Sequence, residues 1–316
     1  MNSMCRMALL AVLTVMSVSS CVTDSGTADI RRLDLEISHG IVPQDSVMYK
    51  ATEKLFEICD YGPVYPLSIF DYADKSSIRE HRDAVEKEFA DMDREKKSLG
   101  KLFSRIRRLL PGAEIPVVFT IISPYTQSIF VVDSAVYLGL NHYLGTDYPL
   151  YESFPDYVRR LKVRGRIPVD MAEAIIRTSY PFRPTSDYPQ ALSRMAYEGA
   201  VAEAVMQVAD VNEQESLGYS DDDYSWLRDN EHDIWDIIVG KKMLFSSDTD
   251  IIRSLIGVGP TTNVISPSSP GRAGRYVGHR LVQSYLDANR SASLESLFSH
   301  EFYDNPSLLS LAGYNP

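Results

Sequence analysis

Residues 169–180 read Val-Asp-Met-Ala-Glu-Ala-Ile-Ile-Arg-Thr-Ser-Tyr. Apolar and charged side chains alternate at helical spacing, so this stretch predicts an amphipathic helix. Ala172 and Ile176 are one helical turn apart and share a face. That face is apolar, and we expect it to pack into the core. Glu173 carries the charge nearest to this face.

The segments around this helix predict a small sheet followed by helices. Three runs rich in Val, Ile and Phe read as strands, at 115–122, 128–132 and 135–140. Helical spacing recurs at 46–60, 76–110 (one helix or a pair), 155–161, 188–209, 221–240, 272–288 and 293–299. No Pro/Gly/Ser-rich seam divides the chain. We therefore expect a single α+β domain that is mostly α-helical, spanning residues 46–316.

The N-terminus reads as an export signal. Residues 1–20 have one charge, Arg6, a short apolar run and then small residues. Cys21 follows at the first mature position, as in a bacterial lipobox, so we expect it to be acylated and to anchor the protein in a membrane. An ordinary signal peptide with an incidental cysteine is the alternative. The polar residues 21–45 predict a flexible tether.

Composition limits the classes of partner and linkage. The net charge is −11, and phosphate contacts need clustered Lys and Arg, so we expect no nucleic-acid partner. The chain has three cysteines. If Cys5 leaves with the signal and Cys21 is acylated, Cys59 has no partner for an intramolecular disulfide. Its apolar neighbours predict a buried thiol.

The common metal and nucleophile motifs are absent from the sequence. No two of the six histidines are spaced i, i+4, so there is no His-Glu-x-x-His. There are also no paired cysteines, no Gly-rich phosphate loop and no Gly-x-Ser-x-Gly. Asp221-Asp222-Asp223 lacks the Gly and Glu of a calcium loop. We expect no metal and no other cofactor.

Several segments resemble the GldB family of gliding-motility lipoproteins. They are residues 138–151 (Leu-Gly-Leu-Asn-His-Tyr-Leu-Gly-Thr-Asp-Tyr-Pro-Leu-Tyr), 155–160, 167–168 and 269–278 (Ser-Pro-Gly-Arg-Ala-Gly-Arg-Tyr-Val-Gly). The resemblance covers roughly residues 45–300, together with the lipobox. The family is similar to zincin-type metallopeptidases, in which the motif helix follows an edge strand. The resemblance therefore implies a zincin-like fold with a degenerate active-site helix.

Carried over by residue, the peptidase pattern keeps its carboxylates and loses its histidines. The two metal histidines fall on Ala172 and Ile176, the general-base glutamate on Glu173, and the third ligand on Glu198. Neither Ala nor Ile has a lone pair to donate, and Zn²⁺ needs three or four N, S or O ligands. The resemblance thus implies a pseudo-metallopeptidase rather than an enzyme.

The surviving glutamates have structural explanations as well. Glu173 fits a capping box that begins at Asp170, and Glu198 could bond a neighbouring Arg or Tyr. Arg272, Arg275 and Arg280 could pair with acidic groups such as Glu198. Gly274 and Gly278 predict close approach of another backbone, as helix packing or as a binding surface.

Three functions remain open from the sequence. The first is a non-catalytic, membrane-anchored lipoprotein of the bacterial cell envelope that binds envelope proteins, with a role in gliding motility, its secretion machinery or envelope upkeep. The second is a lipoprotein that holds a peptide or glycan in the old substrate cleft. The third is a metallopeptidase with rearranged ligands, which would recruit His142 or His279.

Overall fold

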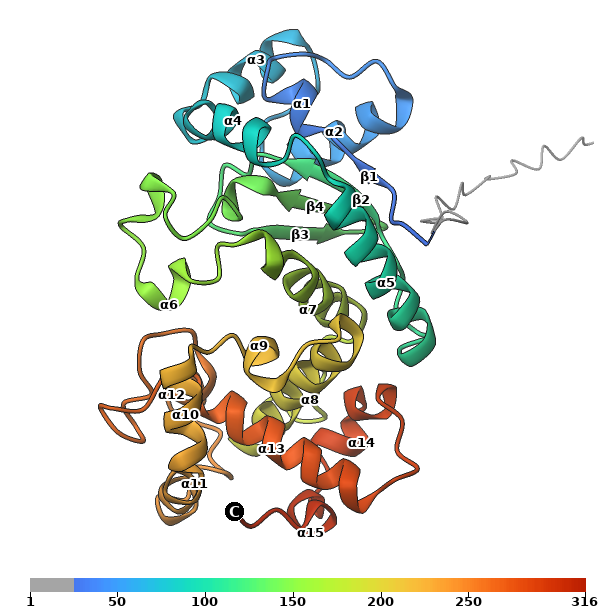
Figure 1. Cartoon of the computed structure of the whole chain (residues 1–316). Coiled ribbons are helices and arrows are strands. Elements are labelled where there is room, and N and C mark those ends of the chain that lie inside the picture. The colour runs from blue at the N-terminus through green and yellow to red at the C-terminus, as the bar shows by residue number, and fades with distance from the viewer. Residues whose placement is uncertain (1–25) are drawn as a thin grey trace, which may run out of the picture.

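The computed structural model describes residues 26–316, which are mostly helical with one four-stranded sheet (Figure 1). The strands are β1 (Ile30–Arg31), β2 (Val117–Ile121), β3 (Ile129–Val132) and β4 (Ala135–Gly139). The helices are α1 (Asp34–Ile37), α2 (Ser46–Ile58), α3 (Pro66–Asp74), α4 (Ser76–Glu88), α5 (Asp93–Leu109), α6 (Asp156–Arg159), α7 (Ile167–Ser179), α8 (Ala191–Ala209), α9 (Glu213–Leu217), α10 (Asp221–Asp229), α11 (Glu231–Gly240), α12 (Thr249–Ile256), α13 (Ala273–Ala288), α14 (His300–Tyr303) and α15 (Leu308–Ala312). Short 3-10 helices lie at Leu140–His142, Pro149–Tyr151, Arg164–Arg166 and Glu295–Phe298.

The sheet has the strand order β1-β2-β4-β3. β2 pairs in parallel with both β1 and β4, whereas β3 and β4 are antiparallel. All five residues of β2 are buried, as a continuous apolar run predicts for a strand that is covered on both faces. β3 forms the edge of the sheet and is half-buried.

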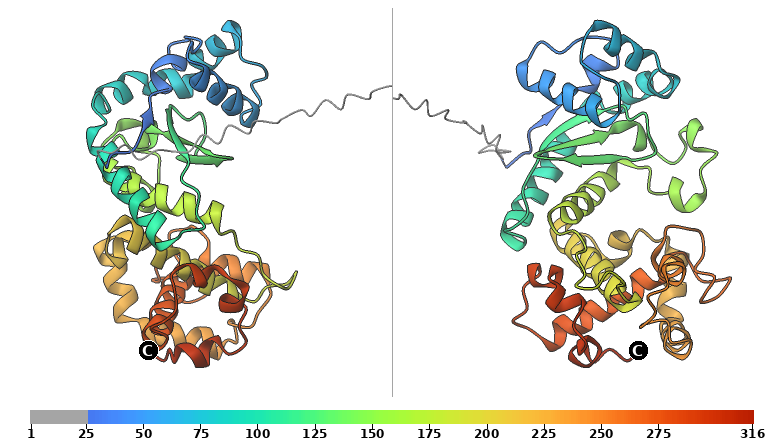
Figure 2. Two further views of the ribbon diagram at one scale, coloured as in Figure 1. Left: turned by 90° about the vertical axis from the view of Figure 1, so that its right-hand side faces the viewer. Right: turned by 180° about the vertical axis from the view of Figure 1, so that it is seen from behind.

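Helices enclose the sheet and then continue into a helical lower half. In Figures 1 and 2, α1–α4 lie beyond one face of the sheet, and α5 and α7 lead away from its other side toward α8. α8 is buried along most of its length, because α5, α7, α9, α12, α13 and α14 all contact it. This central helix ties the sheet to the C-terminal helices and gives the described residues one continuous core.

Two glycines allow α8 and α13 to approach closely. A Cβ placed on Gly199 would lie 2.2 Å from the carbonyl oxygen of Gly278, and one on Gly278 would lie 2.0 Å from the carbonyl oxygen of Met195. Both distances are far inside van der Waals contact, so the two backbones touch only because neither glycine has a side chain. Gly278 therefore serves the packing of α13 on α8, and Gly274 serves its packing on Leu255 of α12, in agreement with the helix-packing interpretation of that spacing.

The folded domain begins earlier than the sequence predicts. β1 pairs with β2, and Leu33 and Ile37 are fully buried. Asp34 is buried too, where it accepts hydrogen bonds from Arg32 and Thr120. The prediction of a flexible tether over 21–45 is therefore wrong from about residue 28 onward. A two-residue strand and a one-turn helix are too short to leave a periodic signal in a polar segment.

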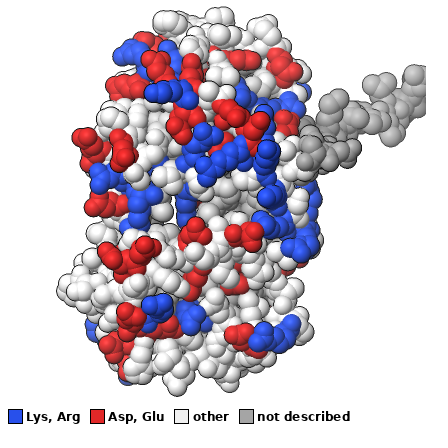
Figure 3. Space-filling view, viewed as in Figure 1, with Lys and Arg blue, Asp and Glu red and all other residues white. Residues whose placement is uncertain are grey.

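The predicted class, α+β and mostly helical, is confirmed. The 76–110 segment is a pair of helices, α4 and α5, and the 221–240 segment is also a pair, α10 and α11. Cys59 is buried and free, as predicted. Among residues 26–316, no helix has both the length and the hydropathy that crossing a bilayer requires. Lys and Arg are interspersed with Asp and Glu over the face drawn in Figure 3.

Candidate binding cleft

α7 presents its apolar face to the core. Pro168 lies in the first turn, where its missing N–H costs no helical hydrogen bond. Ala172 and Ile176 are completely buried, as the sequence predicts. The side chains at these two positions contribute to the apolar core and have no lone pairs to offer a metal.

Glu173 does not cap the helix. α7 begins at Ile167, so Asp170 lies within the helix, where it accepts hydrogen bonds from Arg166 and Tyr143. The capping-box interpretation of Glu173 is therefore wrong. It placed the helix start near residue 169, whereas the apolar Ile167 and Pro168 extend the helix backward by two residues.

Arg177 links Glu173 to Glu198. On α7, one turn after Glu173, its Nε lies 2.9 Å and its Nη2 2.8 Å from Glu173 Oε1. Nη1 lies 3.2 Å from Glu198 Oε1, and Nη2 lies 2.5 Å from Glu198 Oε2. The two carboxylates, 25 positions apart in the sequence, thus meet on facing helices, and a guanidinium lies between them.

Further arginines complete this cluster. Arg194 Nη2 approaches Glu198 Oε1 at 3.4 Å, and Arg275 Nη2 from α13 lies 3.0 Å from Glu173 Oε2. Burial alone would raise the pKa of Glu173, but Arg275 and Arg177 outweigh it and hold that pKa well below its usual range. The pKa of Glu198 is lowered as well, because the hydrogen bonds from Arg177 outweigh burial. Both carboxylates are therefore ionised at neutral pH.

Arg272 lies at the same site without an acidic partner. It has a left-handed backbone, with φ 64°, at the start of α13. Its Nε is buried without a hydrogen-bond partner, and no carboxylate in residues 26–316 forms an ion pair with it. Burial, together with repulsion from Arg275, lowers the pKa of Arg272 to about 10. The guanidinium is charged at neutral pH and incompletely neutralised.

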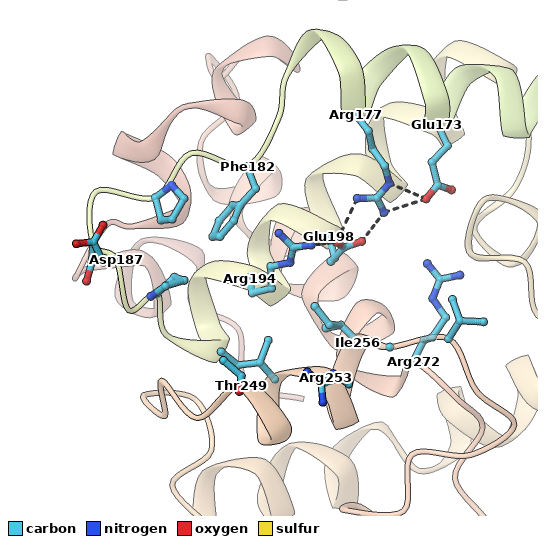
Figure 4. A pocket seen from close by; sticks show the side chains of 16 residues that line it. Glu173, Arg177, Phe182, Asp187, Arg194, Glu198, Thr249, Arg253, Ile256 and Arg272 are labelled. Atoms are coloured by element: carbon cyan, nitrogen blue, oxygen red, sulfur yellow. Dashed lines mark hydrogen bonds and ion pairs between the residues drawn. The ribbon is translucent and has the colours of Figure 1, made fainter. Parts of the chain in front are cut away.

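These charged side chains line a cleft of about 920 Å³ (Figure 4). Glu173, Arg177, Arg194 and Glu198 form one wall, and Arg272 faces them from the opposite side. The remaining lining comes from the 182–189 loop and from α12 with the turn that follows it, namely Phe182, Pro184, Ser186, Asp187, Pro189, Thr249, Ile252, Arg253, Ile256, Gly257 and Val258. The cleft therefore combines arginines and carboxylates with apolar side chains.

A zinc centre of the peptidase type does not fit these residues. Two of its four positions, Ala172 and Ile176, are buried hydrocarbon, and the two carboxylates are already bound to arginine. In the part of the chain that the structure describes, no three His, Cys, Asp or Glu side chains are grouped so that they could hold a metal ion.

The two histidines considered as replacement ligands have other partners. His279 is fully buried, with Nε2 2.8 Å from Glu203 and Nδ1 2.7 Å from Glu213. His142 Nε2 donates to the Tyr125 carbonyl, and Nδ1 accepts from Lys162. Burial and the nearby Lys162 lower the pKa of His142 to about 3, so it is neutral.

The sequence anticipated the carboxylates of the cleft but missed most of its arginines. Arg177 could have been found from its i, i+4 spacing to Glu173, which favours an ion pair on a helix. The sequence allows three arginines to pair with acids such as Glu198. In the structure Arg275 hydrogen-bonds Glu173, Arg280 pairs with Glu231, and Arg272 has no ion pair among the described residues. No local sequence pattern indicates that Arg194 or the 182–189 loop lines the cleft.

The comparisons with known proteins place the chain in one family. The family model described as gliding motility protein GldB matches residues 30–316, nearly all of the folded domain. No curated protein and no solved structure gives a significant match. The match begins at β1, in agreement with the corrected start of the domain. The resemblance inferred from residues 138–151 and 269–278 is confirmed, and the chain belongs to the GldB family of gliding-motility proteins.

Proposed function

We propose that this chain is a non-catalytic, zincin-like lipoprotein of the bacterial cell envelope. It acts by binding, in gliding motility or the secretion machinery linked to it. The observation that carries the proposal is the position of Arg177. Its guanidinium bridges Glu173 and Glu198, the two carboxylates that the resemblance assigns to the metal site of a peptidase. A guanidinium has no vacant coordination site and cannot activate a bound water as Zn²⁺ does.

The arrangement of elements supports the zincin-like part of the proposal. α7 follows a sheet whose edge strand is β3, and the next long helix, α8, brings Glu198 to Glu173. The resemblance places the motif helix after an edge strand; here the last strand before α7 is β4, which lies between β2 and the edge strand β3, and α7 contacts β3. Ala172, Glu173, Ile176 and Glu198 are then the vestigial metallopeptidase positions.

Membrane anchoring rests on the N-terminus and the family. Cys21 lies outside the described residues, and its acylation is part of the proposal. The GldB match is to a family of envelope lipoproteins, and the signal-like residues 1–20 agree with export. The binding partners are envelope proteins, met at the surface of the membrane that holds the acyl chains.

Metal analysis tests the non-catalytic assignment. The full chain is solubilised in nonionic detergent, incubated with zinc and dialysed to remove the unbound metal. Inductively coupled plasma mass spectrometry should then find far less than one equivalent of bound zinc per chain. Glu198→Ala should not change that content. Stoichiometric zinc that disappears in Glu198→Ala would overturn the proposal and favour a peptidase with rearranged ligands.

Cys21→Ala tests the anchor. In cells fed an alkyne-tagged palmitate analogue, the wild-type protein should carry the label and remain in the membrane fraction. The variant should lose both the label and the membrane retention, whereas Cys59→Ala, at the buried cysteine, should lose neither. Unchanged membrane retention of Cys21→Ala would exclude lipid anchoring at this residue.

A further inference from the structure

The cleft carries a positive charge that its own carboxylates do not balance. Four arginines line it, Arg177, Arg194, Arg253 and Arg272, against three carboxylates, Glu173, Asp187 and Glu198. Arg177 and Arg194 are bound to Glu173 and Glu198, and Arg253 pairs with Asp250 at the surface. Arg272 is left, and the buried Arg275 behind the wall adds further positive charge.

Arg272 is built as an anion anchor. Its backbone is fixed at the start of α13, where Tyr219 Oη donates to the Arg272 carbonyl at 3.0 Å. Its side chain points into the cleft, and Figure 4 draws no interaction for it. A guanidinium presents five N–H donors and binds a planar carboxylate through two parallel hydrogen bonds. A bound anion would accept hydrogen bonds from the terminal Nη groups, since Nε itself is buried, and would relieve the repulsion from Arg275.

The apolar sides indicate what accompanies the anion. Val258 is 73% exposed beside Arg272, and Ile252, Ile256 and Phe182 continue the apolar surface along the cleft. An apolar surface of this kind gains free energy when hydrocarbon covers it. A glycan would leave it in contact with hydroxyl groups. The volume of about 920 Å³ suits a ligand of a few residues.

We propose that the cleft binds a short peptide segment through its free carboxylate, with Arg272 holding the carboxylate and the Ile252–Val258 wall holding the neighbouring apolar side chains. The proposal rests on the proposed function, since it gives the non-catalytic cleft a ligand class. The peptide is held and not cleaved, and Glu173 and Glu198 remain bound to their arginines. Arg272 is a binding residue of this site.

Matched peptide pairs test the proposal by calorimetry on the full chain in nonionic detergent. The probes are acetylated tetrapeptides that end in Leu, Phe or Ala, each as the free acid and as the C-terminal amide, with glycerol phosphate as a phosphate control. At least one acid should bind about tenfold to a hundredfold more tightly than its amide, as expected for charge-assisted hydrogen bonds. Arg272→Gln should remove that preference, and Arg272→Lys should restore part of it.

Controls separate binding from folding. Arg290→Gln removes the same charge from an exposed site outside the cleft, where Arg290 pairs with Asp287, and it should leave peptide binding unchanged. Arg272→Gln should not lower the melting temperature, because Arg272 has no ion pair to lose. A large drop in melting temperature would assign Arg272 a structural role and overturn the proposal.

Other outcomes contradict the inference in different ways. Equal binding of acid and amide, no binding of any acid, or an Arg272-dependent response to glycerol phosphate alone would each exclude a peptide-carboxylate site. None of these results would affect the non-catalytic assignment. Mass spectrometry of the peptides after incubation reports on that assignment separately, because cleavage would refute the proposed function whatever the affinity.

Discussion

Replacing Arg177 by Met should destabilise the protein, although Met keeps an unbranched apolar stem in place of the stem of Arg177. The substitution removes four hydrogen bonds and ion pairs to Glu173 and Glu198, whose side chains are 20% and 6% exposed. Breaking a buried ion pair costs about 3–5 kcal/mol, because it leaves an uncompensated charge.

The structure places the cost below most of that range. Arg275 stays beside Glu173, and Arg194 stays beside Glu198, so neither carboxylate is left alone. Arg177 itself is 30% exposed, and solvent screens part of the interaction. We expect the free energy of unfolding to fall by about 2–3 kcal/mol, which lowers the melting temperature by about 4–6 °C in a chain of this size.

Scanning calorimetry at several pH values measures this effect. The pKa values of Glu173 and Glu198 are lowered in the folded state. Their contribution to stability is therefore present above the unfolded pKa of about 4.3 and is lost as the pH falls. The deficit of Arg177→Met should be complete at neutral pH and should shrink at about pH 3.

Arg253→Met serves as the matched control. Arg253 lines the same cleft, but its ion pair with Asp250 is largely exposed, so its loss should change the unfolding free energy by less than about 0.5 kcal/mol. If Arg177→Met matched this control at neutral pH, Arg177 would not stabilise the two carboxylates, and the reasoning from the ion-pair geometry would fail.

The helix contact, the core and the buried histidine give three further predictions. Gly199→Ala, or Gly278→Ala, should lower the unfolding free energy by about 3 kcal/mol or more in a denaturant titration, because the new Cβ forces the backbones apart. Gly240→Ala should not destabilise the protein in the same titration, because no atom lies within 4 Å of the added Cβ. Ile176→Ala should cost about 2–5 kcal/mol through the cavity it leaves, and a cost below 1 kcal/mol would argue that this face is not packed. Burial disfavours the charged form of His279, but the hydrogen bonds that the imidazolium donates to Glu203 and Glu213 outweigh it and raise its pKa. The contribution of His279 to stability is therefore present below about pH 6.5 and is lost as the pH rises through the raised value. The melting temperature should therefore decline as the pH rises above about 6.5, and His279→Gln should reduce this decline. An unchanged dependence of the melting temperature on pH would contradict protonation of His279.

The sequence by itself determined the fold class, the family and the absence of metal-binding side chains at positions 172 and 176. Long periodic segments such as α5 and α13 have a repeating apolar pattern, and the chain can bury that pattern only as the inner face of a helix. The absence of donors at Ala172 and Ile176 is a fact of composition. The same reading missed β1 and α1, because a segment of two to four residues has no period to detect.

Only the tertiary structure decided which groups balance the charge of Glu173 and Glu198. The sequence singles out Glu173 and Glu198, but it also allows Glu173 to be part of a helix cap. The start of α7 at Ile167 excludes that cap. Arg177, Arg275 and Arg272 gather around the carboxylates from two helices that are about a hundred residues apart in the chain. Sequence spacing shows only which residues are neighbours within one helix. The charge balance of this cleft depends on how α7, α8 and α13 pack against one another. That packing is set by side-chain shape and by Gly199 and Gly278, which lie outside α7.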